Sequence, residues 1–204
     1  MLINFEGIDG SGKRTQSKLL KKELLKKGFK VADFSYPDYD SEYGKRIKGF
    51  LEAKLNLSSD EQFLLYLIDI VKNKEEVKQK LRKGHIVIMD RYFLSTIAYQ
   101  SANNFDYEVA KAVTKLIQLP LPSVIFYMEI PLEIAYRRKS KQKGFVDRFE
   151  GNTEFLTKVV NVYERLIKEQ FPSSNWIKLD GTEDPGLLNK KILLKLEELI
   201  KRGV

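Results

Sequence analysis

The sequence predicts an α/β fold in three layers, with a five-stranded, mostly parallel sheet between helices on both faces. The first observation is that short apolar runs alternate with longer segments whose leucines recur at helical spacing. The second is that these runs are continuously apolar, as strands buried on both faces are. The third is size: 204 residues, 43% of them hydrophobic, suit one domain, so we expect 1–204 to form a single unit.

Five short runs are the expected strands. They are apolar or β-branched, and turn residues or glycines follow them. In chain order they are Leu2–Phe5, Lys30–Ser35, His85–Met89, Ser123–Met128 and Trp176–Leu179.

Longer segments between the strands are the expected helices. In the first, Leu20 and Leu24 lie one turn apart, and Gly28 supplies a C-cap. The helices are Gln16–Lys27, Glu42–Leu55, Asp60–Lys83, Leu132–Lys141, Glu154–Lys168 and Pro185–Lys201. Ligands of such folds bind beyond the carboxyl ends of the strands, so functional residues should follow the strands directly.

Composition excludes several kinds of site. The chain has no cysteine, which rules out disulfides, cysteine-bound metal and a thiol nucleophile, and it has a single histidine, His85. The net charge of +8 favours polyanionic partners, either nucleic acid or phosphorylated small molecules. The start MLINFEGIDG lacks signal-peptide features, and the longest apolar stretch, Phe63–Ile68, is too short for a membrane span. We therefore expect a cytoplasmic protein with no membrane partner.

A phosphate-binding loop follows the first strand. Residues 7–13, GIDGSGK, have the G-x-x-x-x-G-K spacing and lie between an expected strand and an expected helix. The glycines let backbone N–H groups surround an anion, the helix N-terminus adds partial positive charge, and Lys13 is placed to bridge the outer phosphates. This context favours a nucleotide site over an ordinary glycine turn. Its expected residues are Gly7, Asp9, Gly10, Ser11, Gly12, Lys13, Arg14 and Thr15.

Arg14 stands where such loops carry a serine or threonine whose hydroxyl binds Mg²⁺. Thr15 comes one residue late and is better placed for an inner phosphate. Adenylate kinases have glycine at the position of Arg14 and remain active, so the hydroxyl is dispensable in related chemistry. Two interpretations stay open: Arg14 points into solvent, or it adds charge to the phosphate site as an arginine finger does.

Three blocks resemble the thymidylate kinase family of P-loop nucleoside monophosphate kinases. They are FEGIDGSGK at 5–13, DRYFLSTIAYQ at 90–100 and DRFE at 147–150, the last resembling the end of the family's lid. Shorter matches at Tyr36-Pro37, Gly44-Lys45, 64–66 and 179–181 fall in family order. The resemblance therefore covers nearly the whole chain.

The resemblance implies a P-loop kinase fold with a short basic lid at about 137–150. It implies an enzyme that transfers the γ-phosphoryl group of ATP to dTMP, giving ADP and dTDP for dTTP supply, with ATP as co-substrate and Mg²⁺. It also implies a homodimer, for which Asp60–Lys83 or Asp106–Gln118 offers an apolar face. Its partners would be small-molecule nucleotides, with no nucleic acid expected.

Residue roles follow from the same resemblance. The catalytic candidates are Lys13, Arg91, Asp90 and Arg148. Asp90 corresponds to the strand-end acid near Mg²⁺, and Arg91 to the arginine on the acceptor phosphate, which suits a planar guanidinium. Arg138 corresponds to the arginine that packs on the ATP adenine.

The acceptor is expected to meet Asp9 at the sugar 3′-hydroxyl, Tyr66 by stacking on thymine, Tyr99 near the position of a 2′-hydroxyl, and Thr96 and Gln100 at the base edge. Arg91 completes this set. Simpler interpretations also exist: Tyr66 as ordinary core, Thr96 as a helix cap and Asp90-Arg91 as a surface ion pair.

The lid segment is strongly basic, with Arg137, Arg138, Lys139, Lys141, Lys143 and Arg148 against one acid, Asp147. Gly10 follows Asp9, which fits family members whose catalytic arginine lies in the lid, although several lid positions hold lysine here. A solvated helix end and a nucleic-acid surface are the alternatives.

Two further positions depart from the family pattern. Ile70 stands four residues beyond Tyr66, where many members have an arginine that reads the thymine carbonyl, and Tyr39 follows Tyr36-Pro37 where some have a phosphate-binding arginine. Relaxed acceptor choice, toward dUMP, UMP or another pyrimidine monophosphate, and a catalytically weak nucleotide-binding protein are therefore the alternative functions.

Overall fold

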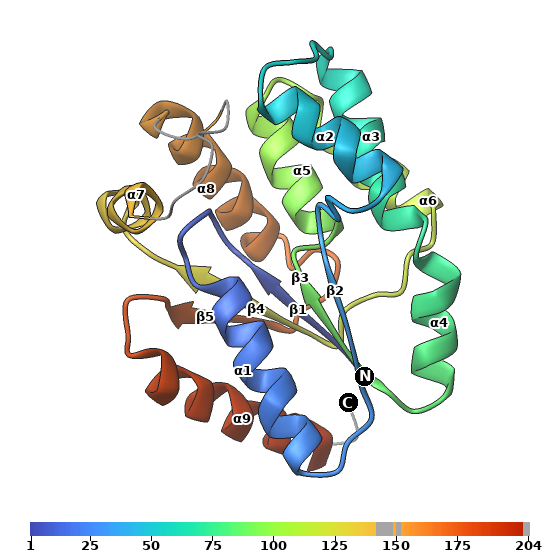
Figure 1. The fold of residues 1–204 in the computed structure, drawn as a ribbon, viewed down its shortest axis with the longest axis vertical. Coiled ribbons are helices and arrows are strands. Elements are labelled where there is room, and N and C mark those ends of the chain that lie inside the picture. Colours follow the sequence, from blue (N-terminus) through green and yellow to red (C-terminus); the bar gives the residue numbers. More distant parts are fainter. Residues whose placement is uncertain (142–148, 150–151, 202–204) are drawn as a thin grey trace.

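The computed structural model of the chain describes residues 1–141, 149 and 152–201. In these residues five strands form one parallel sheet in the order β2-β3-β1-β4-β5 (Figure 1). They are β1 (Leu2–Glu6), β2 (Val31–Ser35), β3 (Ile86–Asp90), β4 (Val124–Glu129) and β5 (Trp176–Asp180). Because β1 lies between β3 and β4, the segments that follow these three strands meet at one edge of the sheet.

Helices cover both faces of the sheet, which confirms the predicted three-layer α/β fold (Figure 1). On one face α1 (Lys13–Lys26) and α9 (Pro185–Lys201) pack Leu20, Leu24 and Ile192 against Phe5 and Phe126 of the sheet. The other face carries α4 (Lys74–Arg82), α5 (Phe93–Ala102) and α8 (Thr153–Lys168). The remaining helices are α2 (Glu42–Leu51), α3 (Ser59–Val71), α6 (Tyr107–Leu116) and α7 (Leu132–Ser140).

One continuous helix over Asp60–Lys83 was predicted, and this is wrong: the structure breaks the segment into α3 and α4. At the break, the N–H of Asn73 bonds to the carbonyl of Ile70 in a tighter turn than an α-helix makes. The Asn73 side chain accepts a hydrogen bond from the Tyr36 hydroxyl at 3.3 Å. Contacts with the segment after β2 therefore override the helical spacing of the sequence.

No helix over 93–102 was among the expected elements, yet α5 occupies this segment. Its residues are buried on nearly every side, polar Ser95, Thr96 and Gln100 included. A helix enclosed in this way has no apolar stripe opposite a polar one, so the usual periodic signal is lost.

None of the described helices is long and apolar enough to cross a membrane.

Candidate functional site

The loop between β1 and α1 curls at the carboxyl edge of the sheet. Gly7 adopts φ +139°, and a Cβ there would lie 2.6 Å from the carbonyl oxygen of Met128, so only glycine fits this close approach. Gly12 adopts φ +99° as the N-cap of α1 and offers no side chain to the first-turn N–H groups. No side chain caps these amides, which is the arrangement that an anion-binding helix N-terminus requires.

Lys13 opens α1 and is buried, with 5% of its surface exposed. Its Nζ donates to the Ile8 carbonyl at 2.7 Å and to Ser11 Oγ at 3.3 Å. Burial, followed by the nearby charge of Arg91, lowers the pKa of Lys13 to about 8, although Asp9, Asp90 and Glu6 act in the opposite direction. The ammonium is thus held within the loop by the Ile8 carbonyl and the Ser11 hydroxyl.

A large cavity of about 720 Å³ opens over this loop, a size within the usual range for small-molecule sites. Its wall includes residues 9–16 of the loop and helix, with Asp90, Arg138, Lys139 and Gly181. Arg14 and Thr15 lie on this wall with exposed side chains.

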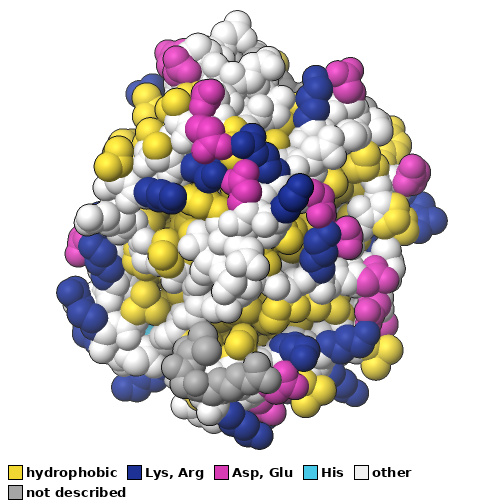
Figure 2. All heavy atoms as spheres, turned by 180° about the vertical axis from the view of Figure 1, so that it is seen from behind, with side chains coloured by type: hydrophobic (Ala, Val, Ile, Leu, Met, Phe, Trp, Pro, Cys, Tyr) yellow, Lys and Arg dark blue, Asp and Glu magenta, His cyan; other side chains and the backbone are white. Residues whose placement is uncertain are grey.

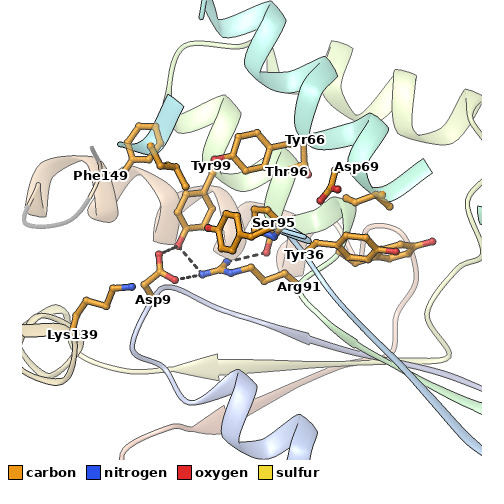
Figure 3. A pocket seen from close by; sticks show the side chains of 15 residues that line it. Asp9, Tyr36, Tyr66, Asp69, Arg91, Ser95, Thr96, Tyr99, Lys139 and Phe149 are labelled. Atoms are coloured by element: carbon orange, nitrogen blue, oxygen red, sulfur yellow. Dashed lines mark hydrogen bonds and ion pairs between the residues drawn. The ribbon is translucent and has the colours of Figure 1, made fainter. Parts of the chain in front are cut away.

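Arg91 follows β3 and points into the site (Figure 3). Its backbone adopts φ +66°, an uncommon conformation for a residue with a side chain. Its Nη2 donates to Asp9 Oδ1 at 2.6 Å and to the Tyr99 hydroxyl at 3.2 Å, and its Nη1 donates to Ser95 Oγ at 3.1 Å and to the Gly7 carbonyl at 3.2 Å. Four hydrogen bonds fix the plane of the guanidinium.

Asp9 lies near three cations, Arg91, Lys13 and Lys139. Burial favours the neutral form of its carboxyl, but Arg91, Lys13 and Lys139 outweigh this effect and hold the pKa of Asp9 well below its usual range. Lys139, from α7, approaches Asp9 from the side away from Arg91 (Figure 3). Asp9 is therefore an ionised carboxylate at neutral pH.

A second, smaller cavity of about 110 Å³ adjoins the first, since Asp9, Arg91 and Lys139 line both. Its wall is largely aromatic and comprises Tyr36, Tyr39, Tyr66, Tyr92, Tyr99 and Phe149, together with Ser95, Thr96, Asp69 and Ile70. Tyr66 is half-buried and also packs against the cluster of Ile47, Phe50 and Leu51. Tyr66 thus belongs partly to the core, and its stacking on a base stays a prediction.

Gln100 lies one turn beyond Thr96 on α5 and is not among the lining residues of either cavity. It is 1% exposed, and its Oε1 has no hydrogen-bond partner within the described part of the chain. Its contact with a base edge stays a prediction.

Asp90 ends β3 on the wall of the larger cavity and is 8% exposed. Within the residues that the structure describes, no three acids or histidines form a metal-binding group. One carboxylate beside a phosphate site nevertheless suits Mg²⁺, which is commonly held by one or two carboxylates, substrate phosphates and water.

Arg138 lies on the wall of the larger cavity. Its Nη1 donates to the Gly10 carbonyl at 3.1 Å and to the Gly181 carbonyl at 2.8 Å, which ties α7 to the loop and to the segment after β5. Arg148, the other predicted lid residue of the site, lies outside the described residues.

Three residues of the site were not predicted from sequence: Glu6, Ser95 and Lys139. Glu6 directly follows the expected strand Leu2–Phe5, and only the structure shows that its carboxylate is completely buried, where an acid needs partners. Lys139 belongs to the basic segment that the sequence singled out, but its position against Asp9 depends on the packing of α7.

Comparison with known proteins supports one family. The family model described as thymidylate kinase matches residues 5–192. The thymidylate kinase of Thermosipho africanus is 38% identical over 188 residues, covering 90% of each chain. That of Thermosipho melanesiensis is 35% identical over 188 residues, covering 90% of this chain and 91% of the relative. The solved structure of a thymidylate kinase from Candida albicans superposes with a TM-score of 0.80 at 24% identity, over 97% of this chain and 91% of that chain.

Proposed function

Because the chain belongs to the thymidylate kinase family and is an ATP-dependent kinase that phosphorylates dTMP to dTDP, we propose a specific binding or catalytic role for each residue of its site. One observation carries the proposal: a phosphate loop and an aromatic cavity adjoin at Asp9, Arg91 and Lys139. Such an arrangement suits a donor triphosphate on one side and a nucleoside monophosphate on the other.

ATP binds in the larger cavity. The glycine-loop amides and Lys13 hold its phosphates, supported by the uncapped N-terminus of α1. Arg138, fixed by the Gly10 and Gly181 carbonyls, forms the wall against the adenine. Mg²⁺, when bound beside Asp90, neutralises the charge on the phosphate oxygens.

The acceptor binds in the smaller cavity. Tyr66 stacks on the pyrimidine, Thr96 faces the base edge, and Asp9 receives the 3′-hydroxyl of the sugar. Tyr99, whose hydroxyl donates to Asp9 at 3.3 Å, fills the space where a 2′-hydroxyl would lie. Arg91 holds the acceptor phosphate at the junction, aimed at the donor.

Phosphoryl transfer depends more on positioning the two substrates and neutralising their charge than on a general base. An oxygen of the dTMP phosphate forms a bond to the γ-phosphorus, and the bond from that phosphorus to the bridging oxygen of ADP breaks. Lys13 and Arg91 stabilise the charge that spreads over the transferred group. Lys139 lines both cavities at this junction, so its charge also stabilises the transferred group.

A coupled assay of ADP release with ATP, Mg²⁺ and a panel of nucleoside monophosphates tests the function. We expect a clear preference for dTMP, and loss of turnover when Lys13 is changed to Met. ATP binding without turnover on any acceptor would contradict the proposal.

Arg14 has an exposed side chain, which favours the interpretation that it points into solvent. We expect Arg14→Ala to keep kcat within about twofold, as surface changes usually do. A fall of kcat by about a thousandfold, the smaller end of what an arginine finger contributes, would instead assign it that role.

A second candidate, relaxed acceptor choice, is favoured by Ile70, which lines the smaller cavity and has no hydrogen-bonding group. Ile70 cannot donate a hydrogen bond to a base carbonyl, so this position does not discriminate against a base that carries an amino group there. The panel should therefore include dUMP and dCMP. We expect Ile70→Arg to lower the rate with dCMP relative to that with dTMP.

We propose also that two copies of the chain associate and that the enzyme works in the cytoplasm. Leu64 and Ile68 on α3 and Val109 and Leu116 on α6 are exposed apolar side chains. On the rear face of the molecule, hydrophobic side chains are interspersed with charged ones (Figure 2). Sedimentation equilibrium tests the association, and Leu64→Asp should shift the mass toward the monomer.

A further inference from the structure

Glu6, the last residue of β1, is fully buried and carries a carboxylate to which the proposed reaction gives no role. Each of its oxygens accepts two hydrogen bonds. Oε1 accepts from Asn4 Nδ2 at 2.9 Å and from the Tyr92 N–H at 3.0 Å, and Oε2 accepts from the Tyr163 hydroxyl at 2.8 Å and from Ser95 Oγ. These four donors satisfy the carboxylate without a solvent molecule.

The first effect of this carboxylate is on the backbone of Arg91. The N–H of Arg91 donates to the Phe5 carbonyl at 3.0 Å, and the next N–H, that of Tyr92, donates to Glu6. Both peptide groups that flank Arg91 are thus fastened to the end of β1. The left-handed conformation at Arg91 costs free energy and persists only where neighbouring contacts hold it. Glu6 supplies one of these contacts.

The second effect is on the hydroxyl of Ser95. Ser95 has one proton, and it is directed to Glu6 Oε2. The lone pairs of the Ser95 oxygen are then directed away from Glu6, where Nη1 of Arg91 donates at 3.1 Å. Burial raises the pKa of Glu6, while the hydrogen bonds from Ser95, Asn4 and Tyr163 act in the opposite direction. In its ionised form Glu6 makes Ser95 an acceptor for the guanidinium, although Glu6 itself forms no hydrogen bond with Arg91 in the described structure.

We propose that Glu6 is a positioning residue of the acceptor-phosphate site, which fixes Arg91 through the Tyr92 N–H and the Ser95 hydroxyl. The inference rests on the proposed function, in which Arg91 holds the acceptor phosphate. Tyr163, on α8, belongs to the same cluster, since its hydroxyl contacts both Glu6 and Ser95, the latter at 2.9 Å.

Glu6→Gln tests this role with little change of volume. The glutamine amide would direct N–H groups at Ser95 or Tyr163, so the Ser95 proton would turn toward Arg91. We expect the KM for the acceptor to rise about tenfold, the scale of one charged hydrogen bond, with the KM for ATP within about twofold of wild type. Tyr163→Phe removes one donor to Glu6, so it should shift the same KM in the same direction by a smaller factor.

The chain offers a matched control in Tyr127→Phe. Tyr127 is 2% exposed and packs on Tyr163 with ring centroids 5.1 Å apart, but no hydrogen bond joins its hydroxyl to the Glu6 cluster in the described structure. Its change to Phe should leave both KM values unaltered. If Glu6→Gln does not fold, the test is the acceptor KM of Tyr163→Phe compared with that of Tyr127→Phe.

A double-mutant cycle separates positioning from general stability. If Glu6 acts through Arg91, Glu6→Gln should add less than about twofold to the acceptor KM in an Arg91→Lys background. A full effect in that background, or a lowered melting temperature with an unchanged acceptor KM, would overturn the inference. The wild-type rate with dTMP tests the proposed function separately, because the variants are compared with wild type on whichever acceptor wild type prefers.

Discussion

The guanidinium of Arg91 and the carboxylate of Asp9 meet at 2.6 Å where the two cavities adjoin. The Arg91 side chain is 13% exposed, while that of Asp9 is 37% exposed, so the pair opens to the cavities on the Asp9 side. Arg91 follows β3 and Asp9 follows β1, neighbouring strands of the sheet. The positive group proposed for the acceptor phosphate is therefore oriented by the protein itself, which lowers the cost of ordering it during reaction.

Changing Arg91 to Lys should cost acceptor recognition although the positive charge is kept. Lysine cannot donate at once to Asp9, Ser95 and a phosphate with the geometry of a planar guanidinium. We expect kcat/KM for dTMP to fall about a hundredfold, the upper range of a charged hydrogen bond, with little change in the KM for ATP. Steady-state kinetics with each substrate varied in turn measures both. Arg82→Lys, at the exposed end of α4, is the matched control, and equal kinetics for the two variants would refute the role of Arg91.

Gly44 in α2 should not tolerate a side chain. A Cβ at Gly44 would lie 1.8 Å from the Asp38 carbonyl oxygen and 2.8 Å from the Tyr39 nitrogen, and Tyr39 lines both cavities. We expect Gly44→Ala to lower the free energy of unfolding by about 2 kcal/mol or more and to raise substrate KM values. Gly49 in the same helix has open space around it, so Gly49→Ala should stabilise by up to about 1 kcal/mol. Denaturant unfolding measures the free energy of unfolding of both variants. An equal change in both would contradict the close contact between Gly44 and the backbone of Asp38 and Tyr39.

Glu169 should contribute stability that acid removes. Burial favours its neutral form, but hydrogen bonds from Lys111, Tyr107 and Arg165 outweigh this and lower the pKa of Glu169 to about 2 from 4.5. Between these two values the unfolded chain binds more protons than the folded one, so the contribution is present above pH 4.5 and is lost as the pH falls toward 2.

We therefore expect Glu169→Gln to lower the free energy of unfolding by about 1 to 2 kcal/mol at neutral pH, with the difference shrinking in acid. Glu198→Gln, which breaks an exposed pair with Lys195, is the control and should change stability little. A difference for Glu169→Gln that stays constant with pH would contradict the assignment.

The sequence predicted well those features that depend on local spacing. The phosphate loop lies between a strand and a helix because GIDGSGK carries both its turn chemistry and its helix start, and the placement of Asp9 and Arg91 at one edge follows from strand ends in a parallel sheet. Features that depend on tertiary packing were harder to predict from the sequence. The helix α5 was hidden by burial on nearly all sides, and the break after Val71 depends on contacts with Tyr36, far away in sequence.

The same distinction applies within the site. Glu6 reads as the polar end of an apolar strand, and only its contacts with Tyr92, Ser95 and Tyr163 show that it is buried and fully bonded. For Gln100 the family pattern predicts a base contact, and the structure shows a side chain that is 1% exposed and absent from the lining of the smaller cavity, so this contact stays a prediction. Side-chain direction on an enclosed helix is set by neighbouring elements, which spacing alone does not reveal.

Binding of ATP should be accompanied by proton uptake near pH 8. The pKa of Lys13 is lowered to about 8 by burial and by Arg91, so about half of the chains carry a neutral Lys13 at that pH. A bound triphosphate favours the ammonium and raises this pKa, so each binding event should take up about half a proton. Calorimetric titration in two buffers with different ionisation enthalpies measures the uptake, and ATP affinity should weaken as the pH rises above 8. Lys13→Arg is the control, since arginine stays charged and takes up no proton. Equal enthalpies of wild type in both buffers would show that Lys13 is already fully protonated before ATP binds.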